Sequence, residues 1–303
     1  MTEHGRRAPI VVGVDHTDAG RLAVVWAADE AARRGLWLRL VHALDWPVGA
    51  DRDPQTDPHR QTWGARFRDA GLRALDEARD LVATRRPELA AVTVLADGAP
   101  VAVLREHTRD AAMIVLGSRR LSAVTELPTI GGVAVPITAH ARCPVVVVRE
   151  PEHTSSEPPT VVVAVDGAQR AEAAVAYAFD EAARRGATVV AVHVRRPPVG
   201  LLAGLRMEEE IPEGRLRLAE ALAGWAEKYP AVPVRREVTV GHPVKALRNA
   251  AEHALCLVVG AHGRGGFAGL LPGSVGQGLI HHAHCPLVIV PTARNDAPSA
   301  AHD

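Results

Sequence analysis

The sequence contains an internal repeat, and this repeat limits the possible folds more than any other feature. Residues 10–15 (IVVGVD) return as residues 161–166 (VVVAVD), and residues 29–35 (DEAARRG) return unchanged as residues 180–186. Later in each copy MIVLG (113–117) corresponds to CLVVG (256–260), followed in turn by ARCPVVVV and AHCPLVIV. Segments repeated in one fixed order indicate two homologous domains.

Each copy alternates short, Val-rich strands with helical stretches. Strands that are apolar on both faces are typical of a parallel sheet covered by helices on each side. We therefore predict two tandem α/β domains, each a doubly wound, Rossmann-like sheet of five parallel strands. The expected boundaries are a first domain at 1–150, a polar, Pro-rich linker at 151–159, a second domain at 160–292 and a disordered tail at 293–303.

The helix before Gly186 should place an apolar stripe of mainly alanines, from Ala171 to Ala182, against the sheet, with Glu181 off that stripe. Gly186 should end this helix. The three cysteines, Cys143, Cys256 and Cys285, are too scattered for a disulfide framework and are expected to be small buried hydrophobic residues.

Composition excludes several classes of function. The chain has 303 residues, with 35 basic and 35 acidic side chains and no net charge, so it lacks the basic field of a general nucleic-acid binder. Residues 1–9 are polar and do not resemble a signal peptide, and no apolar run reaches the roughly 18 residues of a membrane span. We expect a cytoplasmic protein with no membrane and no nucleic-acid partner.

A glycine-rich loop follows Gly260, at the end of the fourth strand of the second copy, and reads AHGRGGFAGLLPGSV. Ligands of open parallel sheets bind beyond the carboxyl ends of the strands. Glycines let successive backbone amides converge on an anion, and Gly273-Ser274 stands where the next helix begins, so free N–H groups would face a phosphate there. Arg264 could add a charged contact. The alternative is a loop that uses glycine for turns alone.

The second copy resembles the ATP-binding branch of the universal stress protein family, whose signature is Gly-x2-Gly-x9-Gly-Ser/Thr. Here the signature is complete as Gly260, Gly263, Gly273 and Ser274. The resemblance implies an ATP site with Mg²⁺, in which Asp166 reaches the ribose–phosphate region and the metal and the backbone of Val194 contacts adenine. The remaining expected cofactor contacts are Arg264, Gly265 and Val275.

The same resemblance implies an adenine nucleotide alpha hydrolase-like fold and a pseudo-dimer of the two domains. The domains are expected to pack through their fifth strands, 145–148 and 287–290. Whole chains are expected to pair again as a homodimer.

The first copy departs from the signature. It keeps Asp15 and Gly117, and Ala43 stands at the position of Val194, so these three residues are its candidate nucleotide contacts. However, Arg120 replaces the second glycine, Glu126 would repel phosphate, and Gly132 replaces the hydroxyl residue. We expect the first domain to bind ATP weakly or not at all. The alternative is that Arg120 holds the phosphates itself.

Histidines are candidate contacts of a different kind. His42 and His193 end equivalent strands, where they could fill the sheet edge or touch a ligand, and His262 lies inside the glycine loop. His281, His282 and His284 are expected to form a surface or interface rather than a metal site. The apolar residues 197–205 suit a lid, a subunit contact or a buried loop equally well.

Hydrolysis of ATP needs a positioned water, a base and charge stabilisation, and the glycine loop supplies only a phosphate cradle. We therefore predict a universal stress protein that binds ATP in its second domain and acts as a nucleotide-responsive stress regulator. Two alternatives stay open: a slow ATP-hydrolysing or nucleotidyl-transferring enzyme on the same fold, and an interaction scaffold that binds no nucleotide. The protein partner and the signalling output are not predicted.

Overall fold

The structure is a computed structural model that describes residues 7–45, 58–118, 132–154, 157–166, 168–195, 203–261 and 274–291. In the first half the elements are β1 (Ile10–Gly13), α1 (Asp18–Arg34), β2 (Leu38–Leu44), α2 (Pro58–Arg85), β3 (Ala91–Asp97), α3 (Pro100–His107), β4 (Met113–Gly117), α4 (Ala134–His140) and β5 (Val145–Val148). The second half contains β6 (Thr160–Ala164), α5 (Ala168–Arg185), β7 (Thr188–Arg195), α6 (Ala203–Ala221), α7 (Trp225–Lys228), β8 (Val234–Val240), α8 (Pro243–Ala250), β9 (Cys256–Gly260), α9 (Ser274–His282) and β10 (Leu287–Val290).

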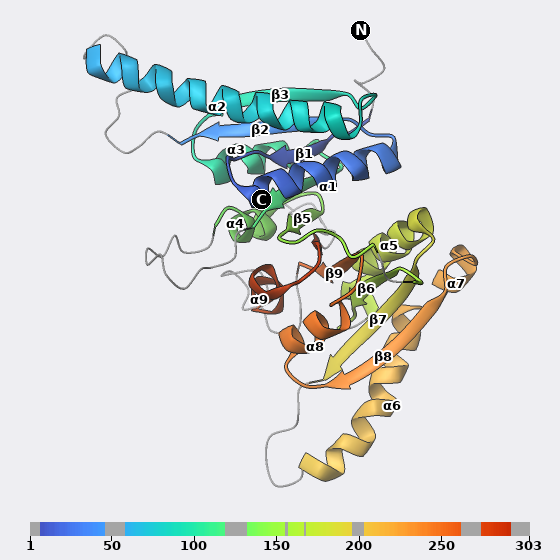
Figure 1. Cartoon of the computed structure of the whole chain (residues 1–303). Coiled ribbons are helices and arrows are strands. Elements are labelled where there is room, and N and C mark those ends of the chain that lie inside the picture. Colours follow the sequence, from blue (N-terminus) through green and yellow to red (C-terminus); the bar gives the residue numbers. More distant parts are fainter. Residues whose placement is uncertain are drawn as a thin grey trace, which may run out of the picture.

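One sheet of ten strands runs through both halves (Figure 1), in the order β3-β2-β1-β4-β5-β10-β9-β6-β7-β8. Within each half the strands are parallel, and the strand order reverses between β1 and β4 and between β6 and β9. The halves meet where β5 and β10 pair antiparallel, with Val288 opposite Val146. This confirms the predicted fold and the predicted pseudo-dimer through the fifth strands.

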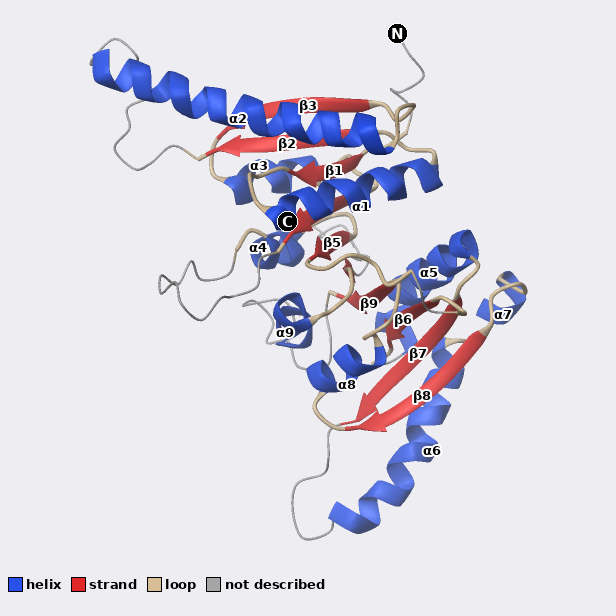
Figure 2. Cartoon of the chain, in the orientation of Figure 1, coloured by secondary structure: helices blue, strands red, loops and turns tan. Residues whose placement is uncertain are grey.

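Helices cover both faces of the sheet (Figure 2) and bury a hydrophobic core on each side. Successive strand residues point to opposite faces, so Ile10 and Val12 enter the core under α1, α2, α5 and α6, whereas Val11 enters the core under α3, α4, α8 and α9. Both cores run across the junction of the two halves. The prediction of strands that are apolar on both faces is therefore correct.

The ends of α1 and α5 follow from local sequence. Thr17 caps α1 by accepting a hydrogen bond from the backbone N–H of Gly20 at 3.0 Å. Gly35 and Gly186 follow the two helices with a φ of 61°, a left-handed conformation that glycine adopts without steric cost. Gly186 thus ends its helix as predicted.

The three cysteines are free and buried, as expected. Burial raises the pKa of the Cys143 and Cys285 thiols to about 12. Among the helices that the structure describes, none is long and apolar enough to cross a membrane.

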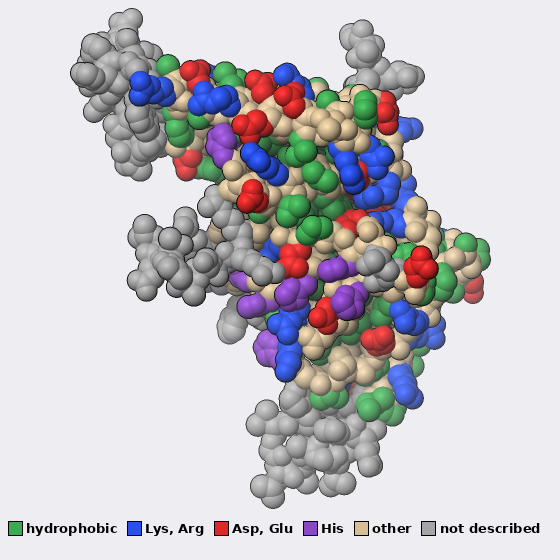
Figure 3. Space-filling model, viewed as in Figure 1, with side chains coloured by type: hydrophobic (Ala, Val, Ile, Leu, Met, Phe, Trp, Pro, Cys, Tyr) green, Lys and Arg blue, Asp and Glu red, His purple; other side chains and the backbone are tan. Residues whose placement is uncertain are grey.

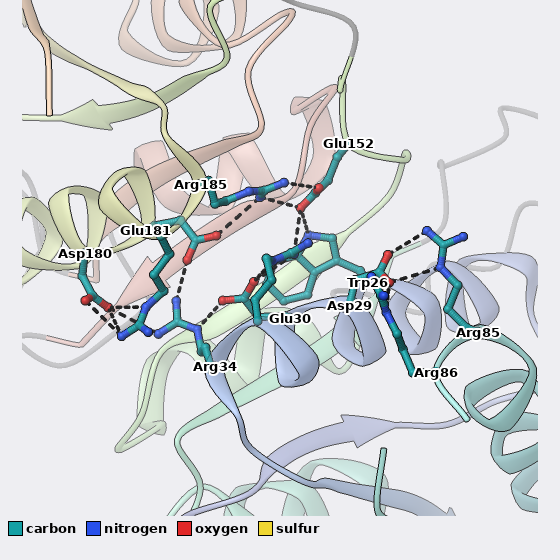
Figure 4. A network of polar contacts seen from close by, with 12 residues as sticks. Trp26, Asp29, Glu30, Arg34, Arg85, Arg86, Glu152, Asp180, Glu181 and Arg185 are labelled. Atoms are coloured by element: carbon teal, nitrogen blue, oxygen red, sulfur yellow. Dashed lines mark hydrogen bonds and ion pairs between the residues drawn. The ribbon is translucent and has the colours of Figure 1, made fainter. Parts of the chain in front are cut away.

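A network of charged side chains lies where α1 meets α5 (Figure 4). Glu30 and Glu181, equivalent residues of the two copies, are 0% and 1% exposed. Arg34 bridges them: its Nε donates to Glu30, and its Nη2 donates to Glu181 at 2.6 Å. Glu181 lies off the apolar stripe of α5, as expected, but it is buried all the same, because antiparallel pairing of β5 with β10 brings α1 over this part of α5.

The chain between the two halves takes part in the same network. Glu152 accepts hydrogen bonds from the indole Nε1 of Trp26 in α1 and, at 2.9 Å, from Nη1 of Arg185 in α5. Burial, followed by repulsion from Glu30, raises the pKa of Glu181 to about 7, against the lowering effect of Arg34 and Arg185. The network therefore joins α1, α5 and residue 152 through charges that are largely withdrawn from water.

Candidate functional site

Three of the predicted nucleotide contacts meet at one edge of the second half. The strands β9, β6 and β7 are consecutive neighbours and parallel, with Val163 opposite Val258 and Ala164 opposite Val192. Their carboxyl ends therefore carry Gly260, Asp166 and Val194 to the same edge, at the point where strand order reverses. This is where an open parallel sheet binds its ligands.

The beginning of α9 belongs to the same neighbourhood. The helix starts at Ser274, and Val275 packs against the core under α8 and α9. The predicted contacts Gly263, Arg264, Gly265 and Gly273, together with His262, lie outside the described residues, as does the side chain of Ser274. The same holds for Arg120 and Glu126 of the first copy and for residues 196–202.

The two equivalent histidines are held in the same way. Nδ1 of His42 donates to the carbonyl of Val14 at 2.9 Å, and Nδ1 of His193 donates to the carbonyl of Val165 at 2.6 Å. The accepting carbonyls directly precede Asp15 and Asp166. These imidazoles therefore fix the turn that presents each aspartate.

Glycines let the covering helices reach the histidine rings. A Cβ at Gly71 of α2 would lie 2.8 Å from Cδ2 of His42, and one at Gly214 of α6 would lie 3.2 Å from Cδ2 of His193. Of the two alternatives for these histidines, the contacts favour filling of the strand end under a helix.

In the first copy the carboxylate of Asp15 is hydrogen-bonded to the residue that caps α1. Oδ1 of the exposed Asp15 accepts from the backbone N–H of Thr17 at 2.9 Å and from its hydroxyl at 2.6 Å. A Cβ on Gly20 would lie only 2.2 Å from that oxygen. The position of the Asp15 carboxylate thus depends on a hydroxyl at residue 17 and on glycine at residue 20.

The second copy has neither of these residues. Ala168 stands at the position of Thr17 and has no hydroxyl, and the buried Ala171 stands at the position of Gly20. An alanine Cβ at that position is incompatible with an aspartate carboxylate placed as in the first copy. The half-buried Asp166 must therefore direct its carboxylate differently from Asp15.

Gly117, a candidate contact of the first copy, has a structural reason to be glycine. A Cβ there would lie 2.5 Å from the backbone carbonyl of Ala19 and 2.6 Å from the nitrogen of Gly20. The end of β4 therefore packs directly on the first turn of α1. The third candidate of that copy, Ala43, lies in β2 and pairs with Ala96 of β3.

The histidines at the end of α9 contact the chain between the two halves. Nε2 of His153 donates to the carbonyl of His284 at 3.1 Å, and Arg149 donates to the carbonyl of Ile280 at 3.2 Å. Burial, followed by the charge of Arg149, lowers the pKa of His281. Among the described residues, no group of three His, Cys, Asp or Glu side chains is arranged to hold a metal ion.

Comparison with known proteins decides the family. The model described as the universal stress protein family matches the chain twice, over residues 7–149 and 159–291. This chain belongs to the universal stress protein family. A universal stress protein of Mycobacterium tuberculosis is 36% identical over 296 residues, covering 95% of this chain and 99% of that protein. One from Mycolicibacterium smegmatis is 35% identical over 305 residues, covering 95% and 97%.

Solved structures share the fold of this universal stress protein. The crystal structure of a universal stress protein from Archaeoglobus fulgidus matches with a TM-score of 0.68 and 16% identity, over 96% of this chain and 98% of that one. A putative universal stress protein from Pseudomonas aeruginosa matches with a TM-score of 0.57 and 18% identity, over 94% and 93%. Both matches span the two halves together, so the tandem arrangement is shared along with the domain fold.

Sequence reasoning missed two features of this universal stress protein. The contrast between Thr17 with Gly20 and Ala168 with Ala171 could have been found by aligning the copies residue by residue just after each aspartate. The burial of Glu30 and Glu181 on either side of Arg34 had no local signal, because the sequence of a DEAARRG segment is the same whether the segment is buried or exposed.

Proposed function

We propose that this universal stress protein binds ATP with Mg²⁺ in its second domain and acts in the cytoplasm as a nucleotide-responsive stress regulator. The observation that carries the proposal is the meeting of Asp166, Val194 and Gly260 at one sheet edge, with α9 beginning beside them. The complete glycine signature joins Gly260 to Ser274 across that edge. Free N–H groups at the start of α9 and the helix dipole favour phosphate.

The difference between the two aspartates supports one site per chain. The Asp15 carboxylate already accepts two hydrogen bonds from Thr17. Ala168 offers Asp166 no such hydroxyl, and Ala171 excludes the same carboxylate position. A carboxylate at residue 166 that does not take the Asp15 position can approach a ribose hydroxyl or a cation from a different direction.

The residues present fit Mg²⁺ as a companion of the nucleotide. Mg²⁺ is commonly bound through one or two carboxylates together with substrate phosphates and waters, and it rarely needs a complete protein cage. Asp166 would supply the carboxylate. The bound cation would neutralise phosphate charge and so strengthen nucleotide binding.

Binding rather than turnover is the proposed activity, because a phosphate cradle alone lacks a base and a positioned water. Nucleotide would act by binding one conformation or assembly of the protein more tightly than another. We further propose a homodimer of whole chains. Light scattering at several concentrations, with and without Mg-ATP, tests both the dimer and its dependence on nucleotide.

Calorimetric titration of Mg-ATP into the whole protein tests the site, with Asp166→Asn as the variant and Asp15→Asn as its matched control. We expect one ATP per chain. Loss of a charged contact costs about 1.5–3 kcal/mol, so Asp166→Asn should weaken binding at least about tenfold. Asp15→Asn should leave it unchanged.

The proposal is wrong if ATP does not bind, or if two equal sites are found and both variants weaken binding alike. ADP and AMP released during the same titrations are measured by chromatography. Steady release of either product would favour the enzyme over the regulator.

A further inference from the structure

The sheet has two edge strands, β3 and β8, at its opposite ends (Figure 1). The fifth strands, β5 and β10, pair with each other in the middle of the sheet, so neither is available to a second chain. Among the described residues, β2 is the only strand that pairs with β3, and β7 is the only one that pairs with β8. A dimer that continues the sheet must therefore use β3 or β8.

One backbone hydrogen bond shows which residues of β3 face outward. The N–H of Leu38 in β2 donates to the carbonyl of Ala90 at 2.9 Å, and Ala90 directly precedes Ala91, the partner of Leu38 in the strand register. In a parallel pair, a residue bonded in this way bridges the two neighbours of its partner, and the partner's own N–H and C=O groups point away. Residues 91, 93 and 95 therefore direct these groups out of the sheet, where another strand can pair with them.

The two edges differ in charge at equivalent positions. Leu95 of β3 pairs with His42, and Val238 of β8 pairs with His193, the equivalent histidine, so the two strands align without a gap. Three uncharged residues of β3 stand where β8 has three charged ones: Val92, Thr93 and Val94 against Arg235, Arg236 and Glu237. Charged side chains on an edge strand oppose pairing with another strand. The edge at β8 is therefore protected, whereas residues 90–96 carry no charge at all.

Large apolar side chains are exposed on both faces of the sheet at the β3 edge. Val92 is 52% exposed and points to the same face as Val94, which packs against the core under α3 and α4. On the other face, Leu72 of α2 is 45% exposed. An extended peptide paired with β3 would leave Leu72 uncovered, so the occupant of this edge must bring a helix as well as a strand.

Leu72 lies on the flank of α2 that is turned away from α1. Gly71 points to the sheet, because a Cβ there would lie 2.9 Å from Cδ1 of Leu95. Glu77 pairs with Arg21 of α1 at 3.3 Å, which puts α1 on one flank of α2. A helix turns by about 100° per residue, so Leu72 falls on the opposite flank, toward the outer side of β3.

We infer that two copies of this chain pair antiparallel through β3, so that the sheets of both copies form one continuous sheet. The inference rests on the proposed homodimer and assigns its contact surface. A two-fold axis at Thr93 places Val92 of each copy opposite Val94 of the other and pairs the outward groups of residues 91, 93 and 95. Every residue pair between 90 and 96 is then uncharged, as a self-complementary interface requires.

The helices over β3 suit the same arrangement. A Cβ on Gly71 would touch both His42 of β2 and Leu95 of β3, so α2 lies above these two strands. Across a pair of β3 strands, the two copies of α2 would be two strand spacings apart, roughly 10 Å, which is the distance of packed helices. Figure 3 shows positive and negative side chains interspersed along α2, so the two helices would not repel each other through a field of one sign. Their contact would cover Leu72.

Light scattering of the whole protein without nucleotide, over a range of concentrations, tests this interface. Val92→Arg/Thr93→Arg gives β3 the residues that β8 has at the equivalent positions. It should raise the dimer dissociation constant at least about tenfold, because the new charges meet across the two-fold axis. Val92→Thr/Thr93→Val, the matched control, changes the same positions without charge and should leave the dimer intact. Circular dichroism checks that both variants fold.

A second control and a measurement without variants separate the outcomes. Arg235→Glu/Arg236→Glu changes the charge of the other edge and should leave the dimer intact; a dimer lost there, or one that resists Val92→Arg/Thr93→Arg, would overturn the inference. In the wild-type protein, dilution to the monomer should speed hydrogen exchange at the N–H groups of residues 91, 93 and 95. Unchanged exchange there would overturn the inference as well.

The proposals fail separately. A wild-type chain that is monomeric at every concentration would remove the homodimer and this inference together, but it would leave nucleotide binding standing. If the protein binds no ATP and Val92→Arg/Thr93→Arg still dissociates the dimer, the nucleotide proposal fails and this one stands.

Discussion

Replacing Arg34 by alanine should destabilise the protein far more than replacing an exposed arginine. Arg34 is only 12% exposed and bridges Glu30 of its own helix to Glu181 of the other half. Its guanidinium also lies over the ring of Tyr177, 5.2 Å from the centroid. Without it, two buried carboxylates lose the charge that they share.

The expected loss follows from these contacts. Removing one partner of a buried ion pair costs about 3–5 kcal/mol when the remaining charge stays buried without compensation. Here Arg33 still pairs with Glu30 at 2.9 Å and Arg185 with Glu181 at 3.4 Å, so we take the lower end of that range. Protonation of Glu181, whose pKa is already raised to about 7, relieves part of this cost. Loss of the contact with Tyr177 adds about 0.5–2 kcal/mol. We therefore expect about 4 kcal/mol at pH 8, where Glu181 is mainly charged.

Urea denaturation followed by circular dichroism measures this loss. The matched control is Arg184→Ala, because Arg184 pairs with Asp180 in the same DEAARRG segment at 3.1 Å but is 38% exposed. An exposed pair contributes about 0–1 kcal/mol. Equal slopes of free energy against urea in all variants would show that the comparison concerns stability and not a change in the unfolded state.

A loss below 1 kcal/mol for Arg34→Ala, equal to that of Arg184→Ala, would refute the reasoning. A triple variant provides a second check: replacing Arg34, Glu30 and Glu181 together by leucine removes Arg34 and both carboxylates that it bridges, while Arg33 and Arg185 keep Glu152 as a partner. Apolar replacement of a whole buried charge cluster is often neutral or stabilising. The triple variant should therefore be more stable than Arg34→Ala alone.

Three further predictions concern pH, packing and thiol reactivity. The pKa of Glu181 is about 7 in the folded protein against an ordinary 4.5, so its contribution to stability is complete below pH 4.5 and is lost as the pH rises through 7. Glu181→Gln should therefore narrow the difference between the urea midpoints measured at pH 5 and at pH 8. An unchanged difference would contradict this. Gly117→Ala should lower the melting temperature by several degrees, because the new Cβ would meet the backbone of Ala19 at 2.5 Å, whereas Gly132→Ala, with no atom within 4 Å, should have little effect. The buried cysteines should not react with a thiol reagent at pH 8 until the protein is unfolded in guanidinium, and rapid labelling of the native protein would contradict their placement.

Much of the fold could be predicted because its signals are local or repeated. The alternation of Val-rich strands with helices, and the glycine that ends α5, follow from short stretches of sequence. The pairing of β5 with β10 came instead from the family resemblance. The buried state of Glu181 could not be predicted, since it depends on a partner helix more than a hundred residues away in the chain.

The candidate site could be predicted only in part. Parallel strands in a known order must bring Asp166, Val194 and Gly260 to one edge, so the sequence suffices for that. The direction of an aspartate side chain depends on atoms a few ångströms away. In the first copy those atoms are the hydroxyl of Thr17 and the empty space at Gly20, neither of which is part of the glycine signature.

One segment at the junction is identical in the two copies. DEAARRG is identical in both, and its glutamates meet at the pseudo-twofold axis, where each copy contacts the equivalent surface of the other. A substitution in one copy there also changes the surroundings of the other copy, as in any isologous interface.

Residues remote from the axis have no such constraint. Thr17 and Gly20 differ from Ala168 and Ala171, their equivalents in the second copy. The junction can therefore keep its residues while the surroundings of the two equivalent aspartates differ. The Arg34 network is one of the contacts that join the two halves, alongside the pairing of β5 with β10. If a nucleotide bound beside Asp166 stabilises the first domain, Arg34→Ala should therefore weaken that effect.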